Sequence, residues 1–581
     1  MRVPFLLAAT LLPVFPSISA AQTVPELEPI IVTATRTEMP ADKTSTAVTV
    51  IGRDEIARSQ ARSVPDLLSG TPGVTVSNNG GPGKTTSIHL RGTEADQVLV
   101  MVDGVKIGSA TLGTAAFQDL PIDLIDRIEI LRGPRAALYG SEAIGGVIQI
   151  FTKKGGEQRT TFSIGGGSFG TMKSAGTVSG SAGPDVWYSF GLSGFTSEGI
   201  NSCKGRPFAQ GGGGCYTYEP DKDGYKNLSG TGRVGWRFAP WGEIEANALH
   251  ARGRNEYDGT DVNLSDIEQQ VLGTALTLTP VDYFKTAFRV AESRDFMKNY
   301  HDGVFRTRFD TRREMATWQS DLTAAPGLHL ITGVDWLTDY VDSTTAYTVT
   351  SRANTGVFAQ LLGEHGAHNL QLALRHDENE QFGGHITGNI GWGYKIVDGL
   401  KLTASYGTAF KAPTFNQLYW PAEYFPPEWG GGGIGGNPKL RPEHSKTAEI
   451  GLAGETAGVR WGVNAFETRA TDLITWGVDG TGFLMPVNVD TARIRGVEFI
   501  ASTRIAAWDL RGNLTLLDPE AIVIGGGVAQ IGKPLFAKIR ETIPHYTINR
   551  RFAVKIPLLT AKLQKNVGVF GAASLFLPTE N

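Results

Sequence analysis

Residues 186–195 read VWYSFGLSGF, and their side chains alternate between two kinds with a period of two. Strict alternation of this kind predicts a β-strand with two different faces. The apolar face consists of Val186, Tyr188, Phe190 and Leu192. The other face is mostly small or polar and consists of Trp187, Ser189, Gly191 and Ser193. One side of the strand therefore suits an apolar environment and the other a polar one.

The same alternation recurs from about residue 157 onward, for example in residues 400–410 and 459–466. In a soluble sandwich, the apolar faces would form the core. Three features favour a membrane barrel instead: the repeat continues for about 400 residues, the second face is small and polar, and aromatic residues recur near the segment ends. Since only a closed barrel satisfies the backbone groups of strands in lipid, we expect an all-β transmembrane barrel over residues 156–581.

The first residues, MRVPFLLAATLLPVFPSISAA, have the order of a secretory signal peptide. Arg2 is followed by an apolar run and then by small residues at positions 19–21, as in the charged, apolar and cleavage regions of such signals. We assign residues 1–21 to this signal. No later run of about 18 apolar residues could form a transmembrane helix. A signal peptide followed by a barrel predicts a multi-pass protein of the bacterial outer membrane.

Charge and cysteine content narrow the partners and the compartment. The chain of 581 residues has a formal net charge of −4, so it lacks the general attraction for a polyanion, and nucleic acid is not an expected partner. Cys203 and Cys215 lie in one glycine-rich stretch. In an oxidising compartment they most simply form one loop-closing disulfide. A metal site is the weaker alternative, because no histidine is nearby.

Residues 40–155 differ from the alternating region and predict a small α+β domain. Residues 53–70 have helical spacing and end at a glycine, which a proline follows two residues later. Runs bounded by glycines come next, and such short apolar runs are typical of buried strands. The four runs are SIHLRG, QVLVMVDGV, RIEILRG and GVIQIFTK.

Acidic residues gather in two stretches after the cysteines. EPDKDGY places Glu219, Asp221 and Asp223 at alternate positions, and NEYDGTDVNLSD follows farther along. Alternate carboxylates near an Asp-Gly turn converge on one point, and such hard oxygen ligands suit calcium. A solvated hairpin turn explains the same residues, since Asp-Gly is a common turn signal. From the residues alone, both interpretations stay open.

Four longer motifs go beyond composition and periodicity. They are RGPRAALYGSEAIGGVI at 132–148, LRGTEADQVLVMVDGVKIG at 90–108, YGTAFKAPTFNQLY at 406–419 and NPKLRPEHSKTAEIG at 437–451. The chain resembles the TonB-dependent outer-membrane receptor family through these motifs, over about residues 28–545, and in particular the family's cobalamin-transporting members. The resemblance implies a barrel of the 22-stranded type with residues 40–155 as a plug inside its lumen. It also implies active uptake of cobalamin.

The segment 22–39 precedes the plug and contains the β-branched run EPIIVTA, for which no nearby segment is an obvious pairing partner. The resemblance implies that this run is the TonB box, the segment that the energy-coupling protein TonB grasps. An extended segment can add as a strand to the edge of a partner's sheet. The residues of the predicted box are Glu28, Pro29, Ile30, Ile31, Val32, Thr33 and Ala34.

The resemblance also implies roles for side chains of the plug. Thr85, Ser87 and Leu112 match positions that touch the substrate in the family. Glu94 stands where the family has an asparagine, which removes one expected hydrogen bond to the substrate. A few ion pairs at a wet interface would hold the plug reversibly. The arginines expected to pair with carboxylates of the barrel wall are Arg91, Arg132 and Arg135.

For calcium, the resemblance implies ligands on an acidic loop and on a Tyr-Asp pair of the next loop. Glu219 replaces a neutral ligand, and Asn201 stands where the family has an aspartate. Because fewer charged ligands weaken a calcium site, we expect weaker binding than in the family. The other residues on ligand positions are Asp221, Asp223, Tyr257, Asp258 and Asp266.

Alternatives to a cobalamin transporter follow from three observations. The aromatic stretch 418–436 suits a ferric siderophore almost as well as a corrin ring. The sequence contains no G-x-S-x-G elbow and only ten histidines, so we do not expect an enzyme. After about Arg551 the alternation stops, and the chain ends in Asn581, where family barrels end in an aromatic residue. We therefore expect the last strands of the barrel to be incomplete. A truncated, non-functional transporter is an alternative to an active one. We expect the protein to be a monomer surrounded by outer-membrane lipid.

Overall fold

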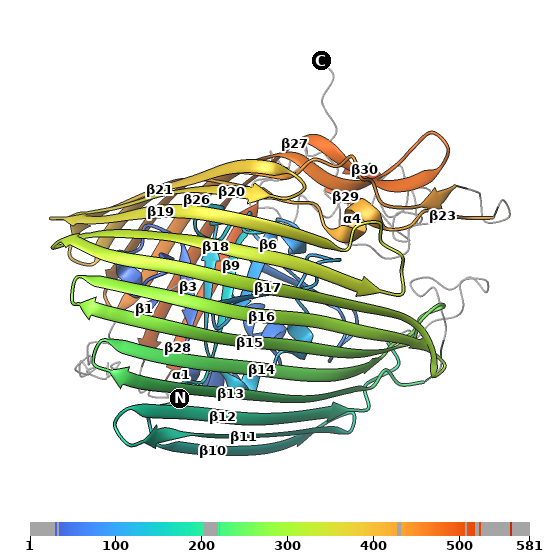
Figure 1. Ribbon diagram of the computed structural model, residues 1–581, viewed down its shortest axis with the longest axis horizontal. Helices are drawn as coiled ribbons and strands as arrows, with labels where there is room; N and C mark the ends of the chain where they lie inside the picture. The colour runs from blue at the N-terminus through green and yellow to red at the C-terminus, as the bar shows by residue number, and fades with distance from the viewer. Residues whose placement is uncertain are drawn as a thin grey trace, which may run out of the picture.

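The chain forms a wide sheet of long strands that wraps around a smaller domain (Figure 1). The computed structural model describes residues 30–31, 34–202, 219, 221–426, 432–505, 508–517, 522–524 and 558–560. No helix in these ranges is both long and apolar enough to cross a membrane. Cys203 and Cys215 lie outside the described residues, so the predicted disulfide stays a prediction.

Nineteen strands of the described chain form the wall as one sheet, from β10 to β28 in sequence order. Two of them, β23 (Glu423–Tyr424) and β24 (Gly433–Ile434), are short strands within a loop, so β22 also pairs directly with β25. The long strands are β10 (Arg159–Gly167), β11 (Thr171–Ala182), β12 (Val186–Ser197), β13 (Tyr225–Ala239), β14 (Gly242–Glu256), β15 (Leu264–Val281), β16 (Phe284–His301), β17 (Val304–Ala325), β18 (Leu328–Ser343), β19 (Ser351–His365), β20 (His368–Asn379), β21 (Gly383–Val397), β22 (Leu400–Lys411), β25 (Glu443–Thr456), β26 (Val459–Val478), β27 (Phe483–Ile505) and β28 (Trp508–Leu517). Separately, β29 (Ile522–Ile524) pairs with β30 (Leu558–Thr560).

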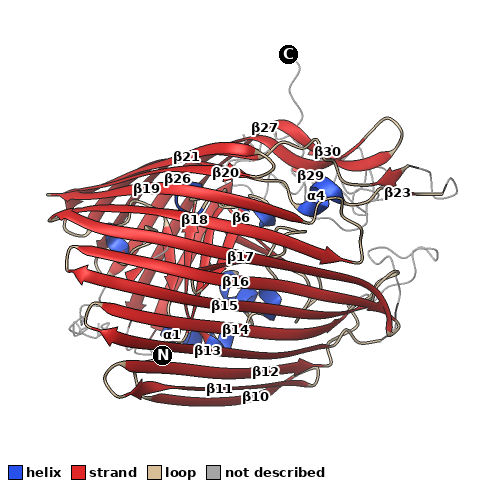
Figure 2. Cartoon of the chain, viewed as in Figure 1, coloured by secondary structure: helices blue, strands red, loops and turns tan. Residues whose placement is uncertain are grey.

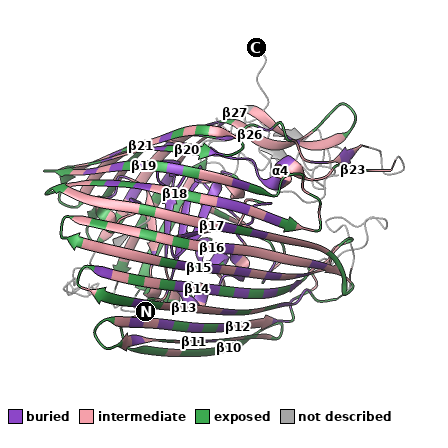
Figure 3. Ribbon diagram, viewed as in Figure 1, coloured by how far each residue is buried: buried purple, intermediate pink, exposed green. Residues whose placement is uncertain are grey.

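The two faces of the wall follow the predicted alternation. In β12, Phe190 and Leu192 are 48% and 69% exposed, whereas Ser189 is buried. Inward residues meet the plug, as where the Gln269 side chain donates a hydrogen bond to the backbone oxygen of Ala116. Figure 3 shows the alternation of exposed and buried residues along the strands. The predicted apolar outer face and polar inner face are therefore confirmed.

In residues 400–410, the alternation places Phe410 on the apolar face with Leu400, Leu402, Ala404 and Tyr406, but Phe410 is an exception. It is only 1% exposed, because the ring of His385 stacks on it with 4.5 Å between the ring centroids. At this end, β21 and β22 pair only as far as Asn389 and Gly407. His385 and Phe410 both lie beyond these last paired residues.

The wall has a short-turn end and a long-loop end. At the short-turn end, the described connections have two or three residues, such as 240–241 and 326–327. The other end carries the longest connections, 198–224 and 412–442. In outer-membrane barrels, short turns face the periplasm and long loops face outward. Within the described residues, β10 and β28 are the two edges of the sheet, and no pairing joins them.

The smaller domain lies inside the wall and contains most of the helices (Figures 1 and 2). Its main sheet has the strand order β3-β8-β9-β6-β7, and β4 pairs with β5. The four predicted strand runs are confirmed and are largely buried. The elements are η1 (Ala41–Lys43), β3 (Val48–Ile51), α1 (Arg53–Ser59), α2 (Val64–Leu68), β4 (Val74–Asn78), β5 (Thr86–Leu90), η2 (Ala95–Gln97), β6 (Val98–Val102), β7 (Val105–Ile107), η3 (Phe117–Asp119), η4 (Ile122–Leu124), β8 (Ile125–Arg132), α3 (Ala136–Tyr139) and β9 (Gly146–Thr152).

The stretch 53–70, whose spacing predicts one helix, forms the two helices α1 and α2. Gln60 has φ +53°, and a residue in this left-handed conformation commonly ends a helix. The hydroxyl of Ser63 then accepts a hydrogen bond from the backbone N–H of Asp66 and begins α2. The expectation of a single helix is therefore wrong, because a cap signal lies inside the apolar pattern.

The N-terminal segment forms a small hairpin before the plug. Strand β1 (Ile30–Ile31) pairs antiparallel with β2 (Met39–Pro40), so the expectation that no nearby segment pairs with this run is wrong. Arg36 has φ +59°, and the Thr35 hydroxyl donates to the backbone oxygen of Thr37. These features reverse the chain. Ala34 is buried, and the other residues of the predicted TonB box, outside the described residues, are Glu28, Pro29, Val32 and Thr33.

Candidate functional site

Three loops of the plug contact the long-loop end of the barrel. We call residues 79–85, 92–97 and 108–116 the apical loops. The Lys84 ammonium donates to the side-chain oxygen of Asn255 at 2.8 Å, near the long-loop end of β14. Contacts of this kind place the apical loops where a solute that arrives from the long-loop end meets the plug.

The predicted substrate-contact residues lie on or beside the apical loops. Thr85 is exposed, and Leu112 is 50% exposed although it is a large apolar residue. Ser87 is half-buried on β5, two residues beyond Thr85. The structure therefore brings these three residues to the same end of the plug.

The barrel holds the loop that presents Leu112. At the start of α4 (Phe415–Tyr419), two backbone N–H groups donate to carbonyl oxygens of loop 108–116 at 3.2 and 3.3 Å. Gly113 has φ +78°, and a Cβ there would lie 2.9 Å from side-chain atoms of both Asp96 and Thr414. Only glycine suits such a crowded left-handed position. These contacts fix the loop between another plug segment and the barrel.

A buried group of charges lies beside the apical loops. The Lys411 ammonium lies 2.8 Å from the carboxylate of Asp96 and 3.4 Å from that of Glu443. The Gln97 amide donates to the same Glu443 carboxylate at 3.1 Å. Sequence reasoning missed this group, although Asp96, Lys411 and Glu443 each lie within one of the quoted motifs. The group joins the plug to β22 and β25 directly beneath the surface.

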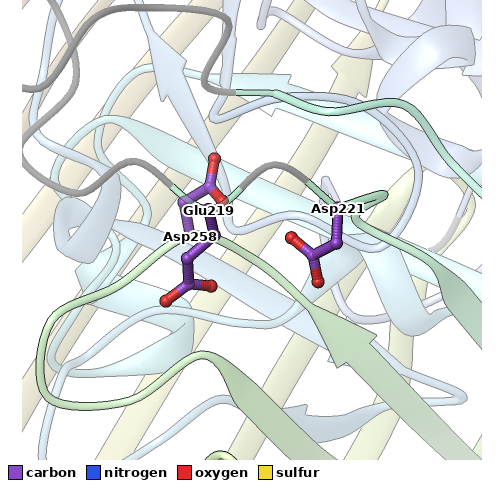
Figure 4. A group of neighbouring side chains, drawn as sticks. All are labelled: Glu219, Asp221 and Asp258. Carbon is purple, nitrogen blue, oxygen red and sulfur yellow. The ribbon is translucent and has the colours of Figure 1, made fainter.

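An acidic cluster lies at the long-loop end, on the loops before β13 and before β15. Glu219, Asp221 and Asp258 each offer a carboxylate oxygen, and these oxygens lie within 4.8 Å of one another. Figure 4 shows Glu219 and Asp221 on one segment and Asp258 on another. Partial desolvation, followed by the carboxylates of Asp221 and Asp302, raises the pKa of Glu219. The arrangement concentrates negative charge at one point.

The other predicted calcium ligands lie nearby but make other contacts. The Asp223 carboxylate accepts a hydrogen bond from the backbone N–H of Ser202 at 2.6 Å. The Asn201 amide donates to the backbone oxygen of Glu219 at 2.9 Å. These two contacts join the beginning and the end of the loop 198–224, which carries Glu219 and Asp221 of the acidic cluster. Two residues of the predicted set point to partners outside the cluster, since Tyr257 hydrogen-bonds the Ser265 hydroxyl and Asp266 pairs with Arg254.

The acidic cluster fits a calcium ion. Calcium binds oxygen ligands at about 2.3–2.6 Å, so two ligand oxygens of one ion can be separated by up to roughly 5 Å. The spacing of the three carboxylates is within this limit. A divalent cation would also relieve the repulsion between them. Glu219, Asp221 and Asp258 are therefore the residues that would hold the ion.

Buried ion pairs also join the plug to β25 and β27 of the wall. The Arg91 guanidinium lies 2.8 Å from the Glu449 carboxylate and 2.7 Å from the Glu498 carboxylate, and all three side chains are almost completely buried. Arg132 lies 3.4 Å from the same Glu498 carboxylate. The predicted pairing is confirmed for these two arginines, but the expectation of a wet interface is wrong, because the pairs are almost completely buried. The predicted pairing is also wrong for Arg135, which donates to oxygens of the plug itself.

A further ion pair attaches the chain just after the predicted TonB box to the barrel wall. Arg36 donates two hydrogen bonds of 2.9 Å to the Asp335 carboxylate of β18. Its guanidinium also lies 4.3 Å from the centre of the Phe358 ring. Sequence reasoning missed this pair, because its members are 299 positions apart. The hairpin of β1 and β2 is thereby held against the wall.

A wall with an apolar outer face, a domain inside its lumen and long loops at one end defines the plugged outer-membrane barrels. Two family comparisons agree with this class. The TonB-dependent Receptor Plug Domain family matches residues 40–147, and the family described as TonB dependent receptor-like, beta-barrel matches residues 205–563. The chain therefore belongs to the TonB-dependent receptor family, as predicted. Proteins of this family are outer-membrane transporters and not enzymes.

Relatives that carry the name Vitamin B12 transporter BtuB match most of the chain. The protein from Photobacterium profundum is 34% identical over 505 residues, which cover 85% of this chain and 79% of the relative. The protein from Vibrio vulnificus is 30% identical over 511 residues, which cover 86% of this chain and 79% of the relative.

Solved structures of more distant proteins have the same fold. A mutant of the ferric enterobactin receptor PfeA from Pseudomonas aeruginosa matches with a TM-score of 0.71 at 19% identity, over 84% of this chain and 82% of that one. The copper transporter OprC matches with a TM-score of 0.65 at 18% identity, over 81% and 80%. Because these neighbours handle different substrates at such low identity, they bear on the fold alone.

Proposed function

We propose that this protein takes up cobalamin across the outer membrane, with energy supplied through TonB. The observation that carries the proposal is the 34% identity to a BtuB vitamin B12 transporter over 85% of the chain. The apical end of the plug supports it, because this end offers the exposed Leu112 together with the polar Thr85 and Ser87. Cobalamin is large, nearly neutral and fringed with amides, so it needs apolar area and scattered hydrogen-bond partners.

In this proposal, the acidic cluster binds calcium and orders the outer loops around the substrate. Glu219 and Asp221 belong to the loop before β13, and Asp258 belongs to the loop before β15. An ion shared by the two loops would fix their relative positions before the substrate arrives, which lowers the entropic cost of binding. A disulfide between Cys203 and Cys215 would constrain the first of these loops further.

TonB would engage the predicted box, residues 28–34, at the short-turn end. A strand of β-branched residues can pair with the edge of a partner's sheet, but the pairing of β1 with β2 competes for the same backbone groups. Release of Arg36 from Asp335 would free the hairpin. A force that TonB exerts on the box would then act on the plug, whose polar contacts with the wall can be exchanged for contacts with water.

Uptake of radiolabelled cyanocobalamin tests the proposal in cells that lack their own cobalamin transporter. We expect uptake in cells that express this chain together with TonB, and none in cells without TonB. An Ile31→Pro variant should bind cyanocobalamin at the cell surface but not take it up, because proline removes a strand N–H group. Ile31→Val, which keeps the strand propensity, is the matched control. Uptake of a ferric catecholate siderophore without uptake of cyanocobalamin would overturn the proposal.

A further inference from the structure

The apical loops carry three charged side chains, and only one of them is exposed. The loops 79–85, 92–97 and 108–116 contain Lys84, Glu94 and Asp96 as their charged residues. Lys84 is 3% exposed and donates to Asn255. The Asp96 side chain is 16% exposed and pairs with Lys411. Glu94 alone presents its charge to the space above the plug.

The structure holds Glu94 in place. The backbone N–H of Glu94 donates to the side-chain oxygen of Gln97 at 3.0 Å. The backbone N–H of Gln97 in turn donates to the backbone oxygen of Glu94 at 3.1 Å, and the two residues form a capping box at the start of η2. The segment that carries the Glu94 carboxylate is fixed in this way and keeps its position when a solute arrives. It therefore contributes a preorganised charge and not a mobile one.

Among the residues that the structure describes, the charges around Glu94 do not neutralise it. Asp96, Glu443 and Lys411 are the charged groups that interact with it, and Lys411 is already shared by the two carboxylates. Although solvent reaches the side chain, desolvation by the surrounding protein, followed by the charges of Asp96 and Glu443, raises the pKa of Glu94 to about 7. When Glu94 is ionised, the three acids and one lysine leave an excess of negative charge beside Leu112.

We infer that Glu94 is a charge-specificity residue, which makes the plug favour positively charged corrinoids over neutral ones and neutral ones over anionic ones. The inference rests on the proposed uptake of cobalamin and adds a rule for which corrinoids bind best. A single charge several ångströms away in a partly hydrated vestibule changes the affinity for a charged ligand on the order of threefold to tenfold. Ferric catecholates, which are anionic, are disfavoured by the same charge.

Three corrinoids that differ at one side-chain amide test the inference by equilibrium binding to the purified full-length protein. They are cyanocobalamin, its monocarboxylic acid and the aminoethyl amide of that acid, which carry zero, one negative and one positive added charge at the same position. Glu94→Gln removes the charge, Glu94→Asp keeps it, and Glu364→Gln removes a carboxylate at the short-turn end as the matched control. Heat-modifiable migration on gels verifies that each variant is folded.

We expect the wild type, Glu94→Asp and Glu364→Gln to bind the aminoethyl amide most tightly and the acid most weakly. Glu94→Gln should reduce the affinity ratio between these two ligands about threefold to tenfold. An unchanged ratio in folded Glu94→Gln overturns the inference and leaves the proposed function standing. If the folded wild type binds none of the three corrinoids, the proposed function fails and the inference fails with it.

Discussion

Two groups of carboxylates in this protein are stabilised in opposite ways. Glu449 and Glu498 face inward from the wall and are neutralised by Arg91 and Arg132 of the plug, at 2.7–3.4 Å. Glu219, Asp221 and Asp258 lie on the outer loops and bring like charges within 4.8 Å of one another. The first group is complete within the chain. The second is suited to a cation from solution.

The difference separates what the fold supplies from what the environment supplies. An internal ion pair depends on the plug being in its place, so it reports on the position of the plug. An external ion depends on its concentration, and a ligand that binds only the folded state adds stability that grows with its concentration. We therefore expect the attachment of the plug by its buried ion pairs to be insensitive to calcium. The conformation of the outer loops should depend on calcium.

Breaking the internal group should have the largest effect. In Arg91→Met, Glu449 loses its cation and Glu498 keeps only the more distant Arg132. Loss of one partner from a buried pair costs about 3–5 kcal/mol, because the remaining charge is left buried. We expect a decrease of this size in the free energy of unfolding of the plug, measured by urea-dependent proteolysis of the detergent-solubilised protein.

The control for this change is the exposed pair of Arg62 and Asp66 in the same domain, where the arginine side chain is 85% exposed. Arg62→Met should alter the free energy of unfolding by less than about 1 kcal/mol. An equally small effect of Arg91→Met would show that Arg91 does not hold the plug, against our account of the internal group.

Changes to the external group should act on binding. Asp221→Asn removes one of the three converging carboxylates, so we expect the calcium affinity to fall about tenfold or more. The affinity for cyanocobalamin at limiting calcium should fall with it and recover at high calcium. Calorimetric titration of the purified protein with calcium measures the first effect. Calorimetric titration with cyanocobalamin at low and at high calcium measures the second.

Asp266→Asn is the comparison for Asp221→Asn. Asp266 occupies a predicted ligand position but pairs with Arg254 in the structure, so its substitution should leave the calcium affinity within about twofold of wild type. A large loss of calcium binding in Asp266→Asn, with none in Asp221→Asn, would reject the cluster as described.

The contrast between these two aspartates shows where sequence reasoning stops. Period-two alternation and long motifs were enough to predict the wall, the plug and the family, because both signals are local in the chain. Which carboxylates converge depends on loop conformation, and a motif cannot supply it. The pairs of Arg36 with Asp335 and of Lys411 with Asp96 join distant positions. Such pairs are set by how the plug sits in the wall.

A pH series sharpens the account of the apical surface. The pKa of Glu94 is raised to about 7 by desolvation, with Asp96, Glu443 and Lys411 as its charged neighbours. Below this pH the carboxyl is mostly protonated and neutral, and above it mostly ionised. The preference for the aminoethyl amide over cyanocobalamin should therefore grow severalfold from about pH 6 to about pH 8.

Glu94→Gln should remove most of this pH dependence, since the remaining carboxylates are paired with Lys411. Binding measurements at matched ionic strength provide the check. An equal pH dependence in wild type and Glu94→Gln would assign the titration to another group.

The smallest effect is expected at the surface of the short-turn end. Lys43 and Glu364 form a pair of 2.9 Å in which both side chains are about two-fifths exposed. Lys43→Ala should change the free energy of unfolding of the plug by less than about 1 kcal/mol, as measured by the same proteolysis. A larger loss would indicate that N-terminal contacts, and not the buried arginines, dominate the attachment of the plug.

Equilibrium binding of cyanocobalamin to the purified protein, with calcium and then with a chelator, tests the central claim most directly. Our account predicts binding that strengthens with calcium, weakens on chelation and resists competition by a ferric catecholate. Binding of the ferric catecholate to folded protein that does not bind cyanocobalamin at any calcium concentration would contradict it.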